Sequence, residues 1–141
     1  MSPYRALRRA RQLRVLASAT CWVLLVRVGL SLSSMKRVRR SFLPRRVTGV
    51  PDESVAAEVV WAVGQAARLI PHASCLTQAL SAQIMLAKRG CPSVLHIGVK
   101  RQDDGEFGAH AWLDSGGTLL LGGTRSSLAT FVPLAHYAAD R

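Results

Sequence analysis

The first part of this sequence contains no acidic residue. Residues 1–46 hold 12 of the 19 lysines and arginines of the chain and none of its eight aspartates and glutamates. Residues 47–141 hold the other seven bases and all eight acids, so their net charge is close to zero. A basic segment can bind nucleic acid, anionic lipid or an acidic protein. Because it carries no nucleic-acid-binding motif and few aromatic side chains for stacking bases, we expect no nucleic-acid partner.

Cysteine is also scarce, with only Cys21, Cys75 and Cys91. An odd and low count argues against a disulfide framework, and no spacing resembles a zinc site. We therefore expect a cytoplasmic protein that needs no metal or cofactor. Residues 15–32 are apolar except for Arg27 and no small-residue cleavage site follows them, which favours a packed or peripheral helix over a signal or an anchor. A contact with the inner face of the membrane is left open.

The length of 141 residues is sufficient for one domain with one core. Two prolines and a glycine in residues 43–51 predict a linker between a basic helical segment, 1–46, and a second part, 51–141. Residues 4–40 are predicted to be helical, with a break or a bend near Gly29. The expected buried stripe of this helix consists of Leu13, Leu16, Trp22, Leu25 and Val28.

Two further helices are predicted after the linker. The first begins at Pro51-Asp52 and ends near Leu69 to Pro71, since proline and aspartate suit the first turn of a helix. The second begins at Ser74, a good N-cap residue, and ends near Lys88, with Gly90 suited to the cap.

The periodicity then changes from that of helices to that of strands. Alternation predicts strands over residues 93–100, 107–114 and 118–121, joined by turns at 101–106 and 115–117. The remaining C-terminal residues are predicted to be loop with at most one short element. Helices followed by an antiparallel meander indicate an α+β fold.

Cys75 is placed in the first turn of its predicted helix. Unpaired N–H groups and the helix dipole favour an anion there, so a thiolate becomes available and an oxyanion could be stabilised. A lone cysteine is more often a small buried residue, but His110 changes this interpretation. His110 lies in the middle of a predicted strand whose other face, with Ala109 and Ala111, already supplies the core contacts. A helix-borne cysteine followed by a strand-borne histidine is the arrangement of papain-like and transglutaminase-like enzymes.

Four blocks in this order carry a family resemblance. They are Cys75-Leu76-Thr77-Gln78-Ala79-Leu80, Lys88-Arg89-Gly90, Leu95-His96-Ile97-Gly98-Val99-Lys100 and Ala109-His110-Ala111-Trp112-Leu113-Asp114. Together the blocks resemble the leader peptidases of bacterial lasso-peptide biosynthesis, which are transglutaminase-like cysteine peptidases. The resemblance is strong over residues 55–125 and looser over the N-terminal helices.

The resemblance implies a fold, an activity and partners. The fold would place a catalytic cysteine at a helix N-terminus that packs on a small antiparallel sheet. The activity would be cleavage of the leader from a ribosomally made precursor peptide, through a Cys75 acyl-enzyme and acid–base catalysis by His110. A leader-recognition protein would deliver the precursor, and a lasso cyclase would use the product.

The third catalytic position departs from the family pattern. Members with a full triad carry an aspartate on the strand after the histidine, but a turn at residues 115–117 would place Gly122 opposite His110. Asp114 is a candidate third residue, yet four residues along a strand is about 13 Å, too far for a hydrogen bond to His110. A turn or substrate-contacting role is favoured for Asp114. The imidazole would then be held by a backbone carbonyl, by Thr124 or by the C-terminal loop, and the prediction is a dyad.

Two alternatives use the same residues. In a transferase, an amine replaces water at the acyl-enzyme. In a non-catalytic docking module, a fold that has lost its third catalytic residue only binds the precursor. Gly122 is the feature that supports the docking module.

Overall fold

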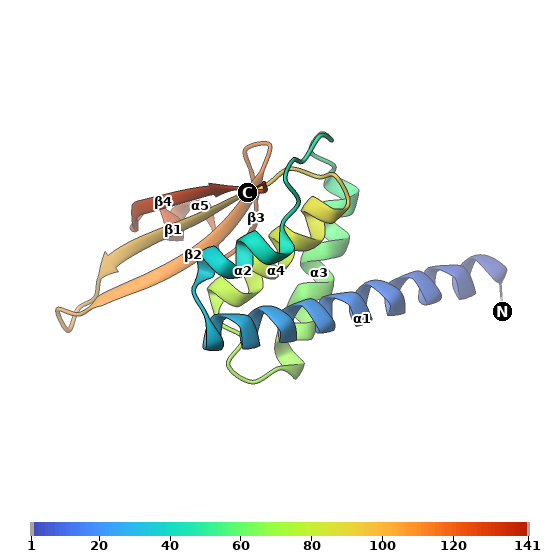
Figure 1. Cartoon of the computed structure of the whole chain (residues 1–141), viewed down its shortest axis with the longest axis horizontal. Coiled ribbons are helices and arrows are strands. Elements are labelled where there is room, and N and C mark those ends of the chain that lie inside the picture. Colours follow the sequence, from blue (N-terminus) through green and yellow to red (C-terminus); the bar gives the residue numbers. More distant parts are fainter. Residues whose placement is uncertain (1, 141) are drawn as a thin grey trace.

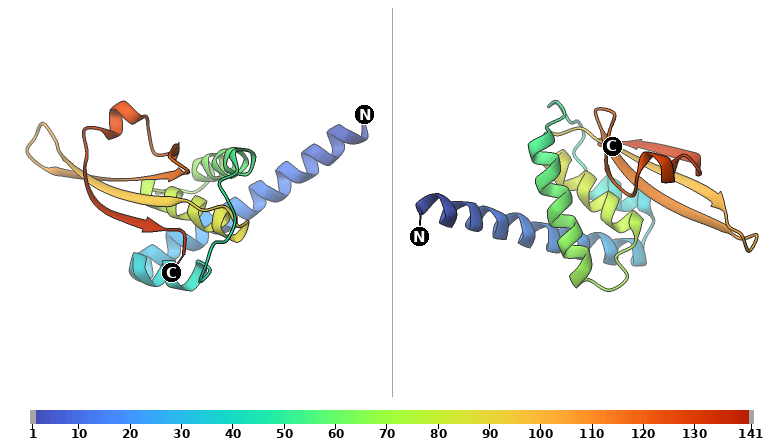
Figure 2. Two further views of the ribbon diagram at one scale, coloured as in Figure 1. Left: turned by 90° about the horizontal axis from the view of Figure 1, so that it is seen from above. Right: turned by 180° about the vertical axis from the view of Figure 1, so that it is seen from behind.

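The computed structural model describes residues 2–140, in which the first four helices lie on one side of a four-stranded antiparallel sheet and a short fifth helix lies on the other (Figures 1 and 2). The α+β architecture predicted from the sequence is confirmed. The helices are α1 (Pro3–Leu32), α2 (Met35–Phe42), α3 (Glu53–Leu69), α4 (Cys75–Lys88) and α5 (Arg125–Leu128). The strands are β1 (Val94–Arg101), β2 (Phe107–Ser115), β3 (Thr118–Leu121) and β4 (Val132–Ala138).

The predicted interruption of the helix is present, but it lies at Ser33 and Ser34, four residues after Gly29. Both serines have extended backbone angles, and the side chain of Ser34 caps α2 by accepting a hydrogen bond from the N–H of Arg37. Gly29 instead lies inside α1 against Val38 of α2, where an added Cβ would be 3.0 Å from a methyl group. The glycine therefore permits close packing of the two helices.

The buried face of α1 differs from the predicted one. Val15, Ala19, Val23 and Val26 are buried in the core, whereas Leu13 is 66% exposed. Small and β-branched residues face inward because α1 packs closely against α3 and α4. Leu25 and Val28, also expected inside, are about half exposed.

The charge composition changes at residues 43–51, but the hydrophobic core continues across this point of the chain. The C-terminal half of α1 belongs to the same core cluster as α3 and α4, so residues 1–46 do not form a separate unit. Only the N-terminal end of α1 projects from the body of the molecule (Figures 1 and 2). The concentration of basic residues in the first part of the sequence did not mark a separate structural unit. The same helix that carries many of these residues also has an apolar face, and that face packs into the common core.

Helices α3 and α4 begin where their capping residues predict. Asp52 accepts a hydrogen bond from the N–H of Val55, and Ser74 accepts one from the N–H of Thr77. Gly90, with a φ of 74°, follows α4 in the left-handed conformation that glycine adopts easily. The predicted start of α4 and the role of Gly90 are confirmed, and Cys75 is the first residue of α4. Helix α3 begins at Glu53, just after the predicted start at Pro51-Asp52, because Asp52 is its N-cap.

The strand order is β3-β2-β1-β4, and β4 was not predicted. This strand pairs with β1, with His136 opposite His96, and a bulge interrupts the pairing between Ile97 and Gly98. Pro133 lowered the strand signal, but a proline is tolerated on an edge strand because one side of the strand needs no partner. The C-terminal residues therefore complete the sheet instead of forming a loop.

The β2–β3 hairpin has a tighter turn than expected. Ser115 pairs with Thr118, and Gly116 and Gly117 form a two-residue turn with φ of 58° and 79°. Positive φ at both positions matches the turn type whose twist fits a hairpin. The register shifts between Leu113 and Asp114, so the predicted pairing of His110 with Gly122 was wrong.

Candidate active site

Cys75 lies at the N-terminus of α4 and is half-buried. The first N–H groups of a helix have no partner within the helix, and the dipole makes this end positive. Ser74 satisfies the N–H of Thr77, while Gln78 braces the preceding loop by donating to the carbonyl of Ala73 at 2.9 Å. The thiol is therefore held at a capped, rigid helix start where a negative charge is favoured.

His110 lies on β2 and is held by a main-chain group. Its Nε2 donates a hydrogen bond to the carbonyl of Gly122, just beyond β3. Since a carbonyl can only accept, this contact requires the proton on Nε2 and leaves Nδ1 of the neutral ring as the free basic nitrogen. The ring also lies against Phe131, with 5.3 Å between the ring centroids.

A backbone carbonyl is one of the three holders considered for His110 from the sequence. Gly122 is at the outer edge of β2, where an added Cβ would lie 2.9 Å from the carbonyl oxygen of Ala111 and 2.5 Å from the Cβ of Trp112. The absence of a side chain thus lets the main chain at Gly122 come close enough to contact the imidazole.

Cys75 and His110 lie on neighbouring elements, since α4 packs on β2. Within residues 2–140, however, no hydrogen bond joins the thiol of Cys75 to the imidazole of His110. Catalytic hydrogen bonds are often long or absent in a free enzyme and form in the complex with substrate. The structure therefore provides the two groups separately and does not show them in contact.

Asp114 is hydrogen-bonded to His96 and not to His110. Its Oδ2 is 2.5 Å from Nε2 of His96, and Nδ1 of His96 is 2.6 Å from Nδ1 of His136. Trp112 stacks on the His96 ring, with centroids 5.5 Å apart. This chain of side chains fixes His96 and Trp112 across three strands, and it gives Asp114 a partner other than the candidate base.

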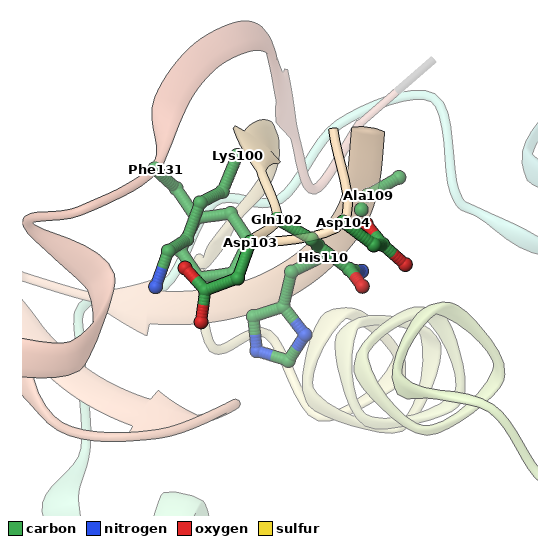
Figure 3. Close-up of a pocket in the computed structure, with 8 residues that line it drawn as sticks. Lys100, Gln102, Asp103, Asp104, Ala109, His110 and Phe131 are labelled. Carbon is green, nitrogen blue, oxygen red and sulfur yellow. The ribbon is translucent and has the colours of Figure 1, made fainter. Parts of the chain in front are cut away.

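A cavity of about 550 Å³ opens beside His110. Its walls come from the β1–β2 hairpin and from the segment before β4, and Figure 3 shows these side chains around the His110 ring. The cavity carries both signs of charge. The residues that line it are Lys100, Gln102, Asp103, Asp104, Gly108, Ala109, His110 and Phe131.

Sequence reasoning missed the contributions of Phe131 and of the His96–His136 pair. Both depend on β4 and on the segment before it, which were expected to be loop. The alternation of Leu134 and His136 in a C-terminal run was the available signal, and Pro133 obscured it.

The other face of the sheet, with Leu95, Ala111 and Leu113 in the core, packs on the helices, whereas α5 lies on the far side (Figure 2).

A model of the transglutaminase-like superfamily matches residues 20–136. The chain therefore belongs to the transglutaminase-like superfamily, a group that includes cysteine peptidases and transferases. Searches of curated proteins and of solved structures gave no match. The match begins within α1 and ends within β4, in agreement with the single core that these elements share.

Proposed function

We propose that this protein is a cysteine peptidase that removes the leader from a ribosomally made lasso-peptide precursor. Membership of the transglutaminase-like superfamily supports cysteine-based acyl chemistry. The observation that carries the proposal is the hydrogen bond from His110 Nε2 to the carbonyl of Gly122, because it leaves Nδ1 available as a base. The position of Cys75 at the start of α4 supports its role as nucleophile.

The proposed reaction has two steps. The thiolate of Cys75 attacks the carbonyl carbon at the leader–core junction, and N–H groups at the start of α4 stabilise the oxyanion. The C–N bond then breaks, and the Nδ1–H of protonated His110 transfers its proton to the departing amine of the core. In the second step, neutral His110 takes a proton from water, the hydroxide attacks the thioester, and the leader leaves with a free carboxylate.

The Gly122 carbonyl replaces the carboxylate that would normally orient the histidine. A neutral carbonyl fixes the tautomer and the direction of the ring, but it stabilises the imidazolium less than a carboxylate would. We therefore expect this enzyme to be slower than one in which an aspartate holds the histidine. The substrate would occupy the cavity beside His110, with a leader-recognition protein presenting the precursor and a lasso cyclase using the product.

Cleavage by the purified full-length chain tests the proposal. The precursor peptide and its leader-binding protein are incubated with the wild type, Cys75→Ala, His110→Ala or Cys91→Ala, and fragments are identified by mass spectrometry. A single fragment pair should form with the wild type and with Cys91→Ala, and be lost in the other two. Equal cleavage by Cys75→Ala would remove this thiol from the mechanism, and an amine adduct on the leader would indicate a transferase.

The role of Asp114 is tested in the same assay. Asp114→Asn should lower the rate by less than about tenfold, because Asp114 contacts His96 and not the proposed base. Removal of an acid–base residue such as His110 typically costs about 10²–10⁴-fold. An equal loss for both variants would show that Asp114 acts through His110 in the substrate complex.

A docking module is the second candidate, favoured by the lack of a hydrogen bond between the thiol and His110 within the described residues. Such a module would bind the precursor without cleaving it. In that case Cys75 would react with a thiol alkylator no faster than Cys91, once the alkylation rates are corrected for the greater exposure of Cys75. Clearly faster alkylation of Cys75, lost on substitution of His110, would argue against this candidate.

A further inference from the structure

One face of α1 is apolar and is not covered by any other part of residues 2–140. Its residues recur at steps of three and four, and they lie about half a helical turn from the buried Ala19 and Val23. We call this face the outer stripe, and it consists of Ala17, Cys21, Leu24, Leu25, Val28 and Leu32.

The outer stripe is exposed to an unusual degree for its composition. Leu24, Leu25 and Val28 are 47–51% exposed and Leu32 is 82% exposed. The most apolar 18-residue window of α1 has a mean hydropathy of 1.9, yet only 22% of it is buried. Single exposed leucines are ordinary, but a continuous row on one helix face indicates an interaction surface.

Positive charge lies at both ends of the outer stripe. Arg14 is exposed on the same side of α1 as the outer stripe, three residues before Ala17, and Lys36 and Arg37 are exposed on α2; Arg5, Arg8 and Arg9 are exposed on other sides of the N-terminal turns. No acidic residue occurs in residues 1–46 to offset them. The partner therefore offers an apolar layer with negative charge near both ends of the outer stripe.

From these features we infer that the outer stripe of α1 rests on the surface of an anionic lipid bilayer. An interfacial helix needs an apolar row that enters the headgroup region and basic side chains that meet anionic lipids, and α1 carries both. The charge on two separate helices matches an extended planar surface better than a local acidic groove on a protein. This inference is independent of the proposed peptidase activity.

The helix lies on the membrane and does not cross it. Crossing would remove Val15, Ala19, Val23 and Val26 from the core that they share with α3 and α4. It would also break the 2.8 Å hydrogen bond from Arg27 to the carbonyl of Pro71 and carry that charge into the bilayer. The folded domain thus stays outside the hydrocarbon region, attached along one side.

Sedimentation with vesicles tests the inference on the full chain. The protein should bind vesicles that contain phosphatidylglycerol, and bind phosphatidylcholine vesicles at least about tenfold more weakly. The triple variant Leu24→Ser/Leu25→Ser/Val28→Ser should lose binding by about tenfold or more. The matched control Val50→Ser/Leu69→Ser/Phe107→Ser, which changes apolar residues elsewhere that are even more exposed, should bind as the wild type does.

A second pair of variants tests how much the basic residues contribute to vesicle binding. Arg14→Gln should weaken binding, whereas Arg68→Gln, with the same loss of charge elsewhere, should leave it nearly unchanged. Circular dichroism checks that each variant is folded. Recovery of all proteins in the supernatant with either vesicle would overturn the inference and indicate a protein partner. Equal binding by the outer-stripe variant and its control would also overturn it, because the attachment would then be electrostatic only.

A fluorescence measurement distinguishes insertion of the outer stripe into the lipid from electrostatic attraction of the protein to the vesicle surface. An environment-sensitive fluorophore on Cys21, in a Cys75→Ala background, should shift to the blue with anionic vesicles. The same label on Leu69→Cys in a Cys21→Ser/Cys75→Ala background should not shift. A shift at both positions or at neither would contradict a specific contact through the outer stripe.

Discussion

Gly122 contributes only main-chain atoms to the candidate site, and the space beside it is already filled. Its φ of 111° lies in a region that residues with a side chain rarely adopt. The main chain can hold the His110 ring because it passes close to Ala111 and Trp112 at the edge of β2. Conformation and close approach therefore both require glycine at this position.

Gly122→Ala should lower the free energy of unfolding by about 1–3 kcal/mol more than Gly117→Ala does. Gly117 also has positive φ, 79°, but nothing lies within 4 Å of its added Cβ. The pair thus separates backbone strain from steric overlap. Urea unfolding followed by circular dichroism measures the difference, and equal losses would show that Trp112 moves aside without cost.

The site residues differ in how well the sequence predicts them. Cys75 and its helix start follow from Ser74 and from the apolar period of α4, which are local signals. The holder of His110 is a backbone group brought close by a bulge in the β2–β3 pairing, and no side-chain pattern records such a bulge. The partner of Asp114 was not predicted either, because it depends on the exact register of β1 against β2.

Helix α2 is short, but it places a buried cation between α4 and β4. Arg39 donates to Gln83 Oε1 at 2.5 Å and to the carbonyl of Ala138 at 2.6 Å, and its guanidinium lies 4.9 Å from the centre of the Tyr137 ring. Gln83 in turn donates to the carbonyl of Tyr137 at 2.9 Å. Burial lowers the pKa of Arg39 from its usual value, although the nearby Tyr137 and Asp140 act in the opposite direction.

Arg39→Met should destabilise the protein by about 2–4 kcal/mol, because the change leaves a buried amide oxygen and a carbonyl without their donor. Arg37→Met changes an exposed arginine of the same helix and should cost less than about 0.5 kcal/mol. Urea denaturation of both variants and the wild type gives the comparison. A loss of similar size in the two variants would mean that the Arg39 contacts contribute little.

Glu58 joins three parts of the helical layer through its carboxylate. The contacts are 2.8 Å to Arg11 of α1 and 2.9 Å to Arg89 just after α4. Partial burial by itself would raise the pKa of Glu58, but the hydrogen bonds and charges of the two arginines outweigh it and lower the pKa. The ionised form is therefore more favourable in the folded chain than in the unfolded one.

A depressed carboxylate pKa stabilises the fold above the unfolded pKa, about 4.3 for glutamate. The contribution is lost as the pH falls through the lower, folded pKa. The wild type should thus exceed Glu58→Gln in stability at pH 7 by at most about 1 kcal/mol, because the pair with Arg11 is exposed. Unfolding midpoints measured from pH 7 to pH 3 should converge at the acid end, and a constant gap would contradict this assignment.

Secondary structure was predicted well where local signals are strong and poorly where packing decides. The capping residues Asp52 and Ser74 and the turn glycines have local effects, so the elements that they delimit were expected. The inward face of α1 depends on how closely α3 and α4 approach it. The leucines were expected in the core because they are the more hydrophobic residues, but the helices approach so closely that alanine and valine occupy the buried face.

At the scale of the whole molecule, α1 has two halves with different roles. Residues 2–14 are exposed and project from the body, whereas Val15 to Val26 contribute one side of the core. The structure thus consists of one unit with a basic extension, and not of the two segments that charge distribution had suggested.

Removal of residues 2–12 should leave a folded protein whose stability falls by no more than about 1 kcal/mol, since only the exposed pair of Arg11 with Glu58 is lost. Removal of residues 2–27 should abolish folding, because it exposes the apolar faces of α3 and α4 that α1 covers. Thermal unfolding and gel filtration distinguish the two truncations. A cooperative transition in the longer truncation would restore the idea of a separate N-terminal segment.

The contact of Arg39 with Ala138 joins positions 99 residues apart in the chain. Closing so long a loop costs entropy before any contact offsets it, so contacts of this kind tend to form late in folding. Until β4 docks, the guanidinium of Arg39 and the amide of Gln83 stay hydrated, and the β1 edge that β4 will cover remains open. Docking of β4 is thus expected late in folding, and until then the open β1 edge is a surface through which two partly folded chains would pair and aggregate.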